Sequence, residues 1–217
     1  MLLAGKLSET MAALRQEVRA PVRVLYDELV KHLTEAATAE GALKTSDVFP
    51  EFALADDDGK FVVSSDLLKS GPLVINFYRG RWCPFCAATV EAMSAATPPI
   101  SADGANVIGI SPEAGPVSLS RGRSRPLNFR MLSDLDNGLA LQCGLLFRLT
   151  DGVIRQYRAS NLDLAKIYGN GSWFLPIPAT YIVLPDGRIG DAYVNPDFRY
   201  RMAPEEILRS LAMLKPR

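Results

Sequence analysis

Two cysteines separated by two residues, Cys83 and Cys86, are the clearest chemical signal in the sequence. They follow the short apolar run 73–78 and precede a segment of good helix formers, so we expect them between a strand and a helix. Unpaired backbone N–H groups and the helix dipole favour an anion there, which lowers the pKa of a thiol. A thiolate is the reactive form of cysteine, and a second cysteine nearby can attack its oxidised or mixed-disulfide form. The spacing therefore predicts thiol redox chemistry.

The residues around the pair suit a nucleophilic thiolate. Arg79 and Arg81 lie on the same loop, where either one brings positive charge near the sulfurs or is simply a solvated surface charge. Trp82 and Phe85 would exclude water or present an apolar docking surface to a protein or peroxide partner. The predicted site is therefore the catalytic pair Cys83 and Cys86, with supporting residues Arg79, Arg81, Trp82, Pro84, Phe85 and, from a distant segment, Pro178.

Other chemistries compete for the pair. A closed zinc site needs four ligands, and only Cys143 and His32 remain, both far away in the sequence, so we expect no metal and no other cofactor. A Cys–His hydrolase would have to recruit His32 from an N-terminal helix outside the core pattern. No glycine loop of the phosphate-binding kind follows a predicted strand. Two inert core cysteines remain an alternative, because buried thiols often act as small hydrophobes.

Two further residues have two interpretations each. Cys143 lies in the apolar stretch 139–146, which suits a packed small residue, while the alternative is a distant resolving thiol. Pro178 precedes a predicted strand. A cis bond there would present the backbone to a disulfide partner, whereas a trans proline would simply begin the strand.

Composition limits the classes of function. Of 217 residues, 48% are hydrophobic and 22% charged, which is the balance of a globular protein with a sizeable core. Twenty-four Lys and Arg against twenty-four Asp and Glu leave no net charge, so we expect neither nucleic acid nor an anionic membrane as partner. The N-terminus resembles neither a signal peptide nor a membrane span, and three cysteines do not make a secreted disulfide framework. These features predict a cytoplasmic protein.

Hydrophobic periodicity predicts alternating strands and helices, which indicates an α/β fold with a largely parallel sheet. Residues 1–41 form a predicted helical extension, and 42–217 form the main domain. The segment 149–173 reads as an irregular insertion that forms a wall of the site. The predicted elements are helices in 8–39 divided at Pro21, a hairpin in 41–65, strands at 73–78, 106–111, 129–132, 180–184 and 188–194, and helices at 87–96, 117–123, 162–168 and 204–214.

The run Phe77-Tyr78-Arg79-Gly80-Arg81-Trp82-Cys83-Pro84-Phe85-Cys86 resembles the active-site loop of peroxiredoxin-like proteins. These belong to the alkyl hydroperoxide reductase and thiol-specific antioxidant (AhpC/TSA) branch of the thioredoxin superfamily. The resemblance extends over about 42–214, including the hairpin, the segment 175–180 and the closing helix. It implies a thioredoxin-like fold, a central mixed sheet flanked by helices, here with an N-terminal helical extension. It also implies a homodimer, which is usual among such relatives.

The resemblance assigns the two cysteines in two ways. A typical peroxiredoxin loop, Phe-Tyr-Pro-x-x-x-Thr-x-x-Cys, places Cys86 on the peroxidatic cysteine, Cys83 on the threonine that orients the peroxide, and Arg79 on the proline. Trp-Cys-Pro-Phe-Cys also resembles the Trp-Cys-x-x-Cys of thioredoxins and makes Cys83 the nucleophile. Pro178 matches the cis-proline of that second branch. The order of attack therefore stays open at this point.

The preferred hypothesis is a peroxiredoxin-like thiol oxidoreductase that cycles Cys83 and Cys86 between dithiol and disulfide and reduces peroxides or disulfides. An external thiol reductant such as thioredoxin would restore the dithiol. One alternative is a thioredoxin-like disulfide reductase without peroxidase activity. Another is a non-enzymatic redox sensor that docks to a partner through the amphipathic segment 25–33.

Overall fold

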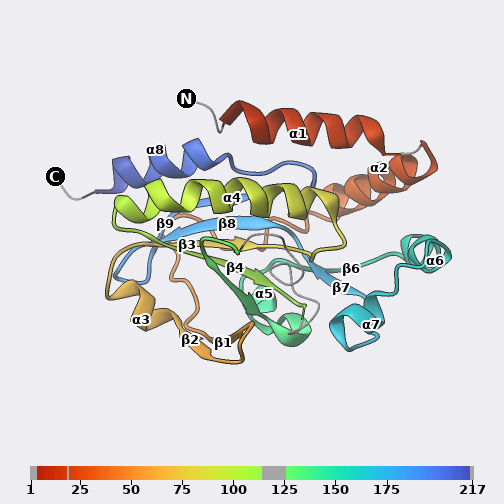
Figure 1. The fold of residues 1–217 in the computed structure, drawn as a ribbon. Helices are drawn as coiled ribbons and strands as arrows, with labels where there is room; N and C mark the ends of the chain where they lie inside the picture. The colour runs from red at the N-terminus through yellow and green to blue at the C-terminus, as the bar shows by residue number, and fades with distance from the viewer. Residues whose placement is uncertain (1–3, 19, 114–125, 216–217) are drawn as a thin grey trace.

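A seven-stranded mixed sheet forms the centre of the described chain (Figure 1). The computed structural model describes residues 4–18, 20–113 and 126–215. The strand order is β2-β1-β5-β4-β3-β8-β9, and only the β3–β4 and β4–β5 pairs are parallel. The expectation of a mixed sheet is thus confirmed, whereas the prediction of a largely parallel sheet was wrong. The strands are β1 (Ala53–Asp56), β2 (Phe61–Val63), β3 (Leu73–Phe77), β4 (Asn106–Ser111), β5 (Arg130–Ser133), β8 (Ala179–Val183) and β9 (Ile189–Val194).

The centre of the sheet is built from strands covered on both faces. Every residue of β3 and of β8 is buried, which explains why both segments are nearly continuous apolar runs. The two strands pair antiparallel, and Asn76 lies opposite Thr180, whose hydroxyl donates to the Asn76 Oδ1 at 2.9 Å. The residues that follow β3 and those that precede β8 therefore lie at the same end of the sheet.

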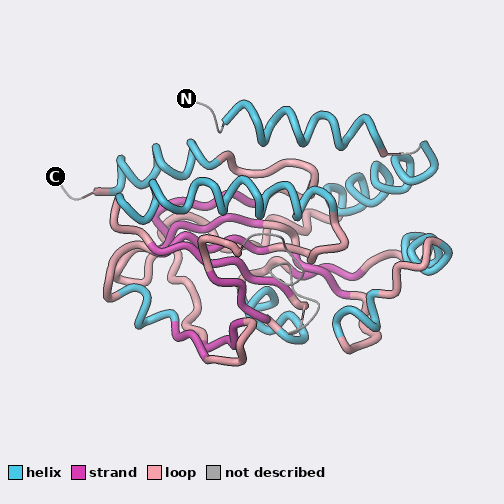
Figure 2. The backbone as a smooth tube through the Cα atoms, in the orientation of Figure 1, coloured by secondary structure: helices cyan, strands magenta, loops and turns pink. Residues whose placement is uncertain are grey.

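Helices cover both faces of the sheet (Figure 2). Helices α4 (Pro84–Ala102) and α8 (Pro204–Leu214) pack together on one face, with α1 (Ala4–Glu17) outside α4. The short helices α3 (Ser64–Leu68) and α5 (Gly138–Gln142) lie on the other side, and η2 (Leu135–Asn137) is a single 3-10 turn. No helix in the described ranges is both long enough and apolar enough to cross a membrane.

The predicted N-terminal extension consists of two helices, as expected. Helix α2 (Ala20–Glu35) begins one residue before Pro21, which therefore occupies the first helical turn, where a missing N–H costs little. The side chains of Tyr26, Leu29 and Leu33 recur at helical spacing and are buried. The extension is thus attached to the main domain through one face of α2 and through α1, which packs on α4.

Helix α4 is longer than predicted because it continues through Pro98 and Pro99. A proline at position 98 cannot donate to the carbonyl of Ser94, a loss that ordinarily ends or kinks a helix. The Asn128 side-chain amide donates to that carbonyl instead, at 2.7 Å. A residue thirty positions along the chain therefore satisfies the group that the proline leaves unpaired.

The segment 149–173 is more regular than expected. It contains α6 (Asp151–Ala159) and α7 (Leu164–Tyr168), of which only the second was predicted. Helix α6 begins after Thr150, whose hydroxyl accepts from the Val153 N–H, a standard N-terminal cap. A small two-stranded sheet of β6 (Leu146–Arg148) and β7 (Phe174–Pro176), together with α5, was also not predicted. The predicted helix at 117–123 lies outside the described residues.

Gly71 introduces β3 and provides a test of how tightly this strand is held. Its φ is +145°, and a Cβ there would overlap the carbonyl oxygen of Gly104. We expect Gly71→Ala to lower the free energy of unfolding by about 2 kcal/mol or more, measured by urea denaturation. Gly152→Ala is the control, because Gly152 lies in α6 with no atom within 4 Å of the added methyl. It should be neutral or stabilising by up to about 1 kcal/mol. Equal effects would contradict the packing argument.

Candidate functional site

The cysteine pair lies where the sequence predicts, between a buried strand and a helix. Cys83 is the N-cap residue of α4, with extended backbone angles, and Pro84 is the first helical residue. Cys86 follows in the first turn. Both cysteines are free thiols with no exposed surface. The start of α4 lies at the end of the molecule that also carries α2, α6 and α7 (Figure 1).

Arg79 is the residue that defines the site. Its side chain is completely buried, and its Nη2 donates to the Cys83 Sγ at 3.0 Å. The guanidinium lies 3.7 Å from the ring centroid of Phe198 and 5.1 Å from that of Trp82. Within the described residues it forms no ion pair with a carboxylate, and its Nε and Nη1 have no hydrogen-bond partner. A buried cation without a counter-ion is costly, so a negative charge on Cys83 fits this environment. Arg79 is therefore not a solvated loop charge.

A second arginine reaches the other sulfur, and sequence reasoning missed it. Arg201 Nη2 lies 3.7 Å from the Cys86 Sγ. The same side chain donates to the backbone carbonyls of Phe198 and Tyr200. The only signal in the sequence is a pair of arginines, Arg199 and Arg201, shortly before the closing helix, and nothing in that spacing indicates contact with residue 86.

The two thiols have opposite pKa shifts. Burial opposes ionisation of Cys83, but the hydrogen bond with Cys86 and the charges of Arg79 and Arg201 outweigh it, so its pKa lies well below the ordinary value. Burial raises the pKa of Cys86, and the neighbouring Cys83 thiolate raises it further. The arrangement therefore favours a Cys83 thiolate beside a protonated Cys86.

Aromatic residues from the insertion enclose the loop, which confirms that 149–173 forms a wall of the site. The Trp82 indole N–H donates to the Tyr168 hydroxyl at 2.8 Å, and that hydroxyl donates to the Arg79 carbonyl. Trp82 also packs edge-on against Tyr157, with 5.5 Å between ring centroids. Tyr157 and Tyr168 are both buried. These contacts hold the loop backbone on the side facing α6 and α7.

The N-terminal extension also reaches the site. Tyr26 of α2 packs edge-on against Phe198, the ring beneath Arg79, at 5.1 Å between centroids. The neighbouring Asp27 pairs with Arg199 at 2.5 Å. The segment 197–201 is therefore held by the extension on one side. On the other side it contacts Arg79 through Phe198, and it contains Arg201 itself. No pattern in residues 1–41 predicted this contact.

Glu113, which follows β4, is another residue that sequence reasoning missed. Its side chain is buried, and its Oε1 accepts from the backbone N–H of Arg81 at 2.9 Å. Burial raises the pKa of this carboxyl to about 8, although the Arg81 N–H and the Arg81 charge act in the opposite direction. Arg81 itself is exposed and contributes a backbone contact to the site.

The remaining predicted residues have mixed outcomes. Phe85 is buried against Phe198 and is core packing, not a docking surface, whereas Trp82 is half-buried and Pro84 is exposed. No cis peptide bond occurs in the described chain, so of the two interpretations of Pro178 the structure agrees with the trans proline that begins a strand. Pro178 directly precedes β8, at the same end of the sheet as the loop.

The other candidate ligands lie apart from the pair. Cys143 is buried, and burial together with Asp134 raises its pKa to about 12, which supports the interpretation as a packed residue. His32 is exposed on α2. Across the ranges 4–18, 20–113 and 126–215, no three His, Cys, Asp or Glu side chains are grouped to hold a metal ion.

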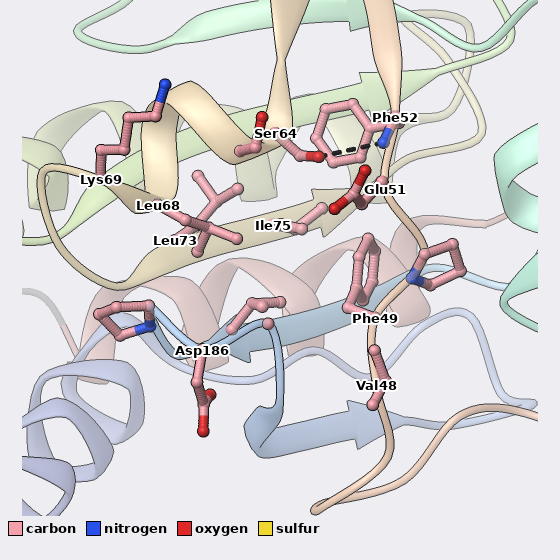
Figure 3. Close-up of a pocket in the computed structure, with 15 residues that line it drawn as sticks. Val48, Phe49, Glu51, Phe52, Ser64, Leu68, Lys69, Leu73, Ile75 and Asp186 are labelled. Atoms are coloured by element: carbon pink, nitrogen blue, oxygen red, sulfur yellow. Dashed lines mark hydrogen bonds between the residues drawn. The ribbon is translucent and has the colours of Figure 1, made fainter.

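A separate pocket of about 370 Å³ lies at the other end of the sheet (Figure 3). Its lining includes Leu73, the first residue of β3, and Val183, the last residue of β8, whereas the cysteine loop follows the last residue of β3. The Phe52 N–H donates to the Ser64 hydroxyl at 3.0 Å across its rim. This pocket is therefore not part of the dithiol site.

The contact between Arg79 and Cys83 can be tested by titration. We expect Arg79→Met to raise the Cys83 pKa by about 1–3 units, because the nearest positive charge is lost. The measurement is the ultraviolet absorbance of the thiolate against pH in a Cys86→Ser, Cys143→Ser background. Arg81→Met is the matched control, since Arg81 is exposed and its contact is through the backbone. A pKa that is unchanged in Arg79→Met would contradict the assignment.

The protonation of Glu113 predicts a pH-dependent stability. Its folded-state pKa is raised to about 8 from an ordinary 4.5, so the unfolded chain ionises first and stability falls as pH rises through that window. Glu113→Gln removes this loss. We expect the difference in free energy of unfolding between Glu113→Gln and wild type to increase in favour of the variant by up to about 1.4 kcal/mol per pH unit across that window. The free energies are measured by urea denaturation from acid to neutral pH. If those of wild type and Glu113→Gln changed with pH in parallel, Glu113 would be ionised in the folded protein.

The comparisons with known proteins all indicate the same family. The chain is 32% identical over 104 residues to peroxiredoxin Bcp of Escherichia coli, and the aligned part covers 48% of this chain and 65% of that relative. The chain thus spans slightly less than two-thirds of the length of this curated relative.

Solved structures support the fold. Peroxidoxin BcpB of Mycobacterium tuberculosis matches with a TM-score of 0.62 at 20% identity, covering 80% of this chain and 99% of that one. AhpC of the same organism matches with a TM-score of 0.59 at 19% identity, covering 80% and 93%. Both matches are consistent with a thioredoxin-like fold. The AhpC/TSA family model matches residues 45–192, more than half of the sequence, and the chain therefore belongs to the AhpC/TSA family.

Proposed function

We propose that this protein is a thiol-dependent peroxidase in which Cys83 attacks the peroxide and Cys86 resolves the product. The observation that carries the proposal is the hydrogen bond from the buried Arg79 to the Cys83 Sγ at 3.0 Å. A guanidinium in that position stabilises a thiolate, the nucleophilic form of cysteine. Membership of a family whose relatives are named peroxiredoxins supports peroxide as the oxidant.

The proposed catalytic cycle has three steps. The Cys83 thiolate attacks the O–O bond of a hydroperoxide, forms a sulfenic acid and releases an alcohol once the leaving oxygen takes a proton. The Cys86 thiol then displaces water from the sulfenic acid and forms the Cys83–Cys86 disulfide. An external dithiol such as thioredoxin reduces that disulfide and is itself oxidised. Cys86, whose pKa is raised, keeps its proton until the second step.

Burial favours a small substrate. Neither sulfur has exposed surface, and a protein disulfide must bring its own sulfur into line with the attacking one. A hydroperoxide needs much less room, although the loop or its aromatic cover must still open locally. Reduction by a protein dithiol requires a larger opening, which Pro84, exposed between the two cysteines, is placed to begin.

A disulfide reductase without peroxidase activity is the second candidate. The lowered pKa of Cys83 supports it, because the first cysteine of Trp-Cys-x-x-Cys is the attacking residue in the thioredoxin branch that this motif resembles. The same dithiol can carry out both reactions, so the substrate depends on whether a peroxide or a protein disulfide can reach the buried sulfurs. A redox sensor would oxidise reversibly with neither activity.

We further propose the division into a helical extension, residues 1–41, and a thioredoxin-like domain, residues 42–217. The family model begins at residue 45, close to this boundary, and the Leu43 N–H donates to the Cys143 carbonyl at 3.1 Å as the chain enters the domain. The homodimer and the cytoplasmic location stay predictions.

Single-cysteine variants test the order of attack. With peroxide and a thioredoxin recycling system, we expect Cys83→Ser to consume no peroxide. Cys86→Ser should complete one turnover and accumulate a sulfenic acid on Cys83, located by dimedone labelling and mass spectrometry. Cys143→Ser, which removes a thiol outside the pair, should keep wild-type turnover.

Three outcomes would contradict the proposal in different ways. Sulfenic acid trapped on Cys86 in Cys83→Ser would reverse the roles of the two cysteines. Insulin reduction without peroxide consumption would favour the disulfide reductase. Reversible oxidation of the wild-type pair with neither activity would favour the sensor.

A further inference from the structure

Glu113 lies directly beneath the loop that joins Arg79 to Cys83. Its Oε1 accepts from the Arg81 N–H, and its carboxyl packs against the backbone of Gly80. A Cβ on Gly80, whose φ is +139°, would lie 2.7 Å from that oxygen, 2.8 Å from the Glu113 Cδ and 2.9 Å from the Trp82 Nε1. Glycine is required here because the carboxyl occupies the space of a side chain.

The surroundings of this carboxyl favour its neutral form. The side chain is completely buried, and no described residue gives its Oε2 a hydrogen bond. An ionised carboxylate with one N–H partner is costly to bury. The titratable groups that act on it are Arg81 above it, Cys83 at the start of α4 and Asp57 in the β1–β2 turn. Tyr168 of α7 is also near enough to be affected, since the Glu113 charge contributes to the raised pKa of that hydroxyl, after burial.

One of these groups changes charge during the proposed reaction. The reduced site carries a Cys83 thiolate, which repels a second negative charge and helps to keep Glu113 protonated. The Cys83–Cys86 disulfide is uncharged, so that repulsion ends on oxidation. The Arg81 N–H and the Arg81 charge, which favour the carboxylate, are then opposed by burial and Asp57 alone.

We propose that Glu113 is the redox-linked proton carrier of the dithiol site: it holds a proton while Cys83 is a thiolate and gives it up when Cys83 and Cys86 form a disulfide. This inference rests on the proposed function and deepens it. In the oxidative half, the thiolate breaks the O–O bond and the leaving alkoxide takes one proton from solvent. Glu113 releases one proton to solvent once the disulfide has formed, so no net proton is taken up over this half. Glu113 acts through the loop and the charge of the site, so it is a positioning and proton-storing residue.

The reductive half balances in the same way. An external dithiol that becomes a disulfide transfers two electrons and sheds two protons. Cys86 takes one of them, and Cys83 remains a thiolate. The second proton returns to the Glu113 carboxylate, where in its absence it would be lost to solvent. Reduction of this protein should therefore depend less on pH than a thiolate–thiol pair alone would require.

The test is the equilibrium of the full-length protein with reduced and oxidised dithiothreitol, measured from about pH 6 to about pH 8. In Glu113→Gln, which preserves an acceptor for the Arg81 N–H, the equilibrium constant for reduction should rise about tenfold per pH unit, because one proton is released. In wild type it should rise by less. Asp134→Asn is the matched control, since Asp134 is also a buried carboxyl with a raised pKa, and its shift comes mainly from burial and Asp136, not from the active-site cysteines. It should behave as wild type.

The outcomes separate this inference from the function on which it rests. Equal pH slopes in wild type and Glu113→Gln, with the disulfide formed in both, would overturn the role of Glu113 alone. Failure of wild type to form the Cys83–Cys86 disulfide would overturn both. Infrared difference spectra of wild type need no variant: the protonated carboxyl band should be present in the reduced form and weaken on oxidation. An unchanged band would also overturn the inference.

Discussion

The burial of a guanidinium beside a thiol is the constraint on which the rest of the site depends. Arg79 has no exposed surface and no carboxylate partner among the described residues, so the Cys83 sulfur, 3.0 Å away, is the group that can balance its charge. A buried cation is tolerated only where its surroundings stabilise it. Here those surroundings are the face of Phe198, the ring of Trp82 and the sulfur itself. Any change that moves one of them changes the ionisation of the cysteine.

The supporting elements can be understood from that requirement. Phe198 is held from behind by Tyr26 of the extension, and Trp82 is fixed by Tyr168 of the insertion. The extension and the insertion are the two parts of the chain least expected from the α/β pattern, yet both contact the residues that surround Arg79. Between them, the sheet supplies a rigid base, because β3 is buried along its whole length and paired on both sides. The dithiol is thus positioned by the sheet and the start of α4, and it is enclosed by residues of the extension and the insertion.

The sequence predicted those features whose causes are local. The β3 strand, the position of Cys83 and Cys86 at a helix start, the Pro21 division and the closing helix α8 follow from periodicity, proline placement and capping, and all agree with the structure. The features it missed depend on distant partners. Helix α4 passes Pro98 because Asn128 satisfies a carbonyl, and Arg201 reaches Cys86 only because the segment before α8 folds back over α4. Burial of Glu113 likewise depends on Gly80, a residue of another loop.

The two departures from the typical peroxiredoxin loop explain each other. Arg79 takes the place of the proline and Cys83 the place of the threonine, and in the structure these two residues are the partners of one hydrogen bond. An arginine buried at position 79 without an anion at position 83 would be strongly unfavourable, and a cysteine at 83 without the arginine would keep its proton. The pair therefore works as a unit. Because it places positive charge beside Cys83 and lowers the pKa of that thiol, it favours the thiolate at Cys83 and not at Cys86, the position that a gapless alignment gives to the peroxidatic cysteine. This is the charge distribution that the proposed order of attack requires.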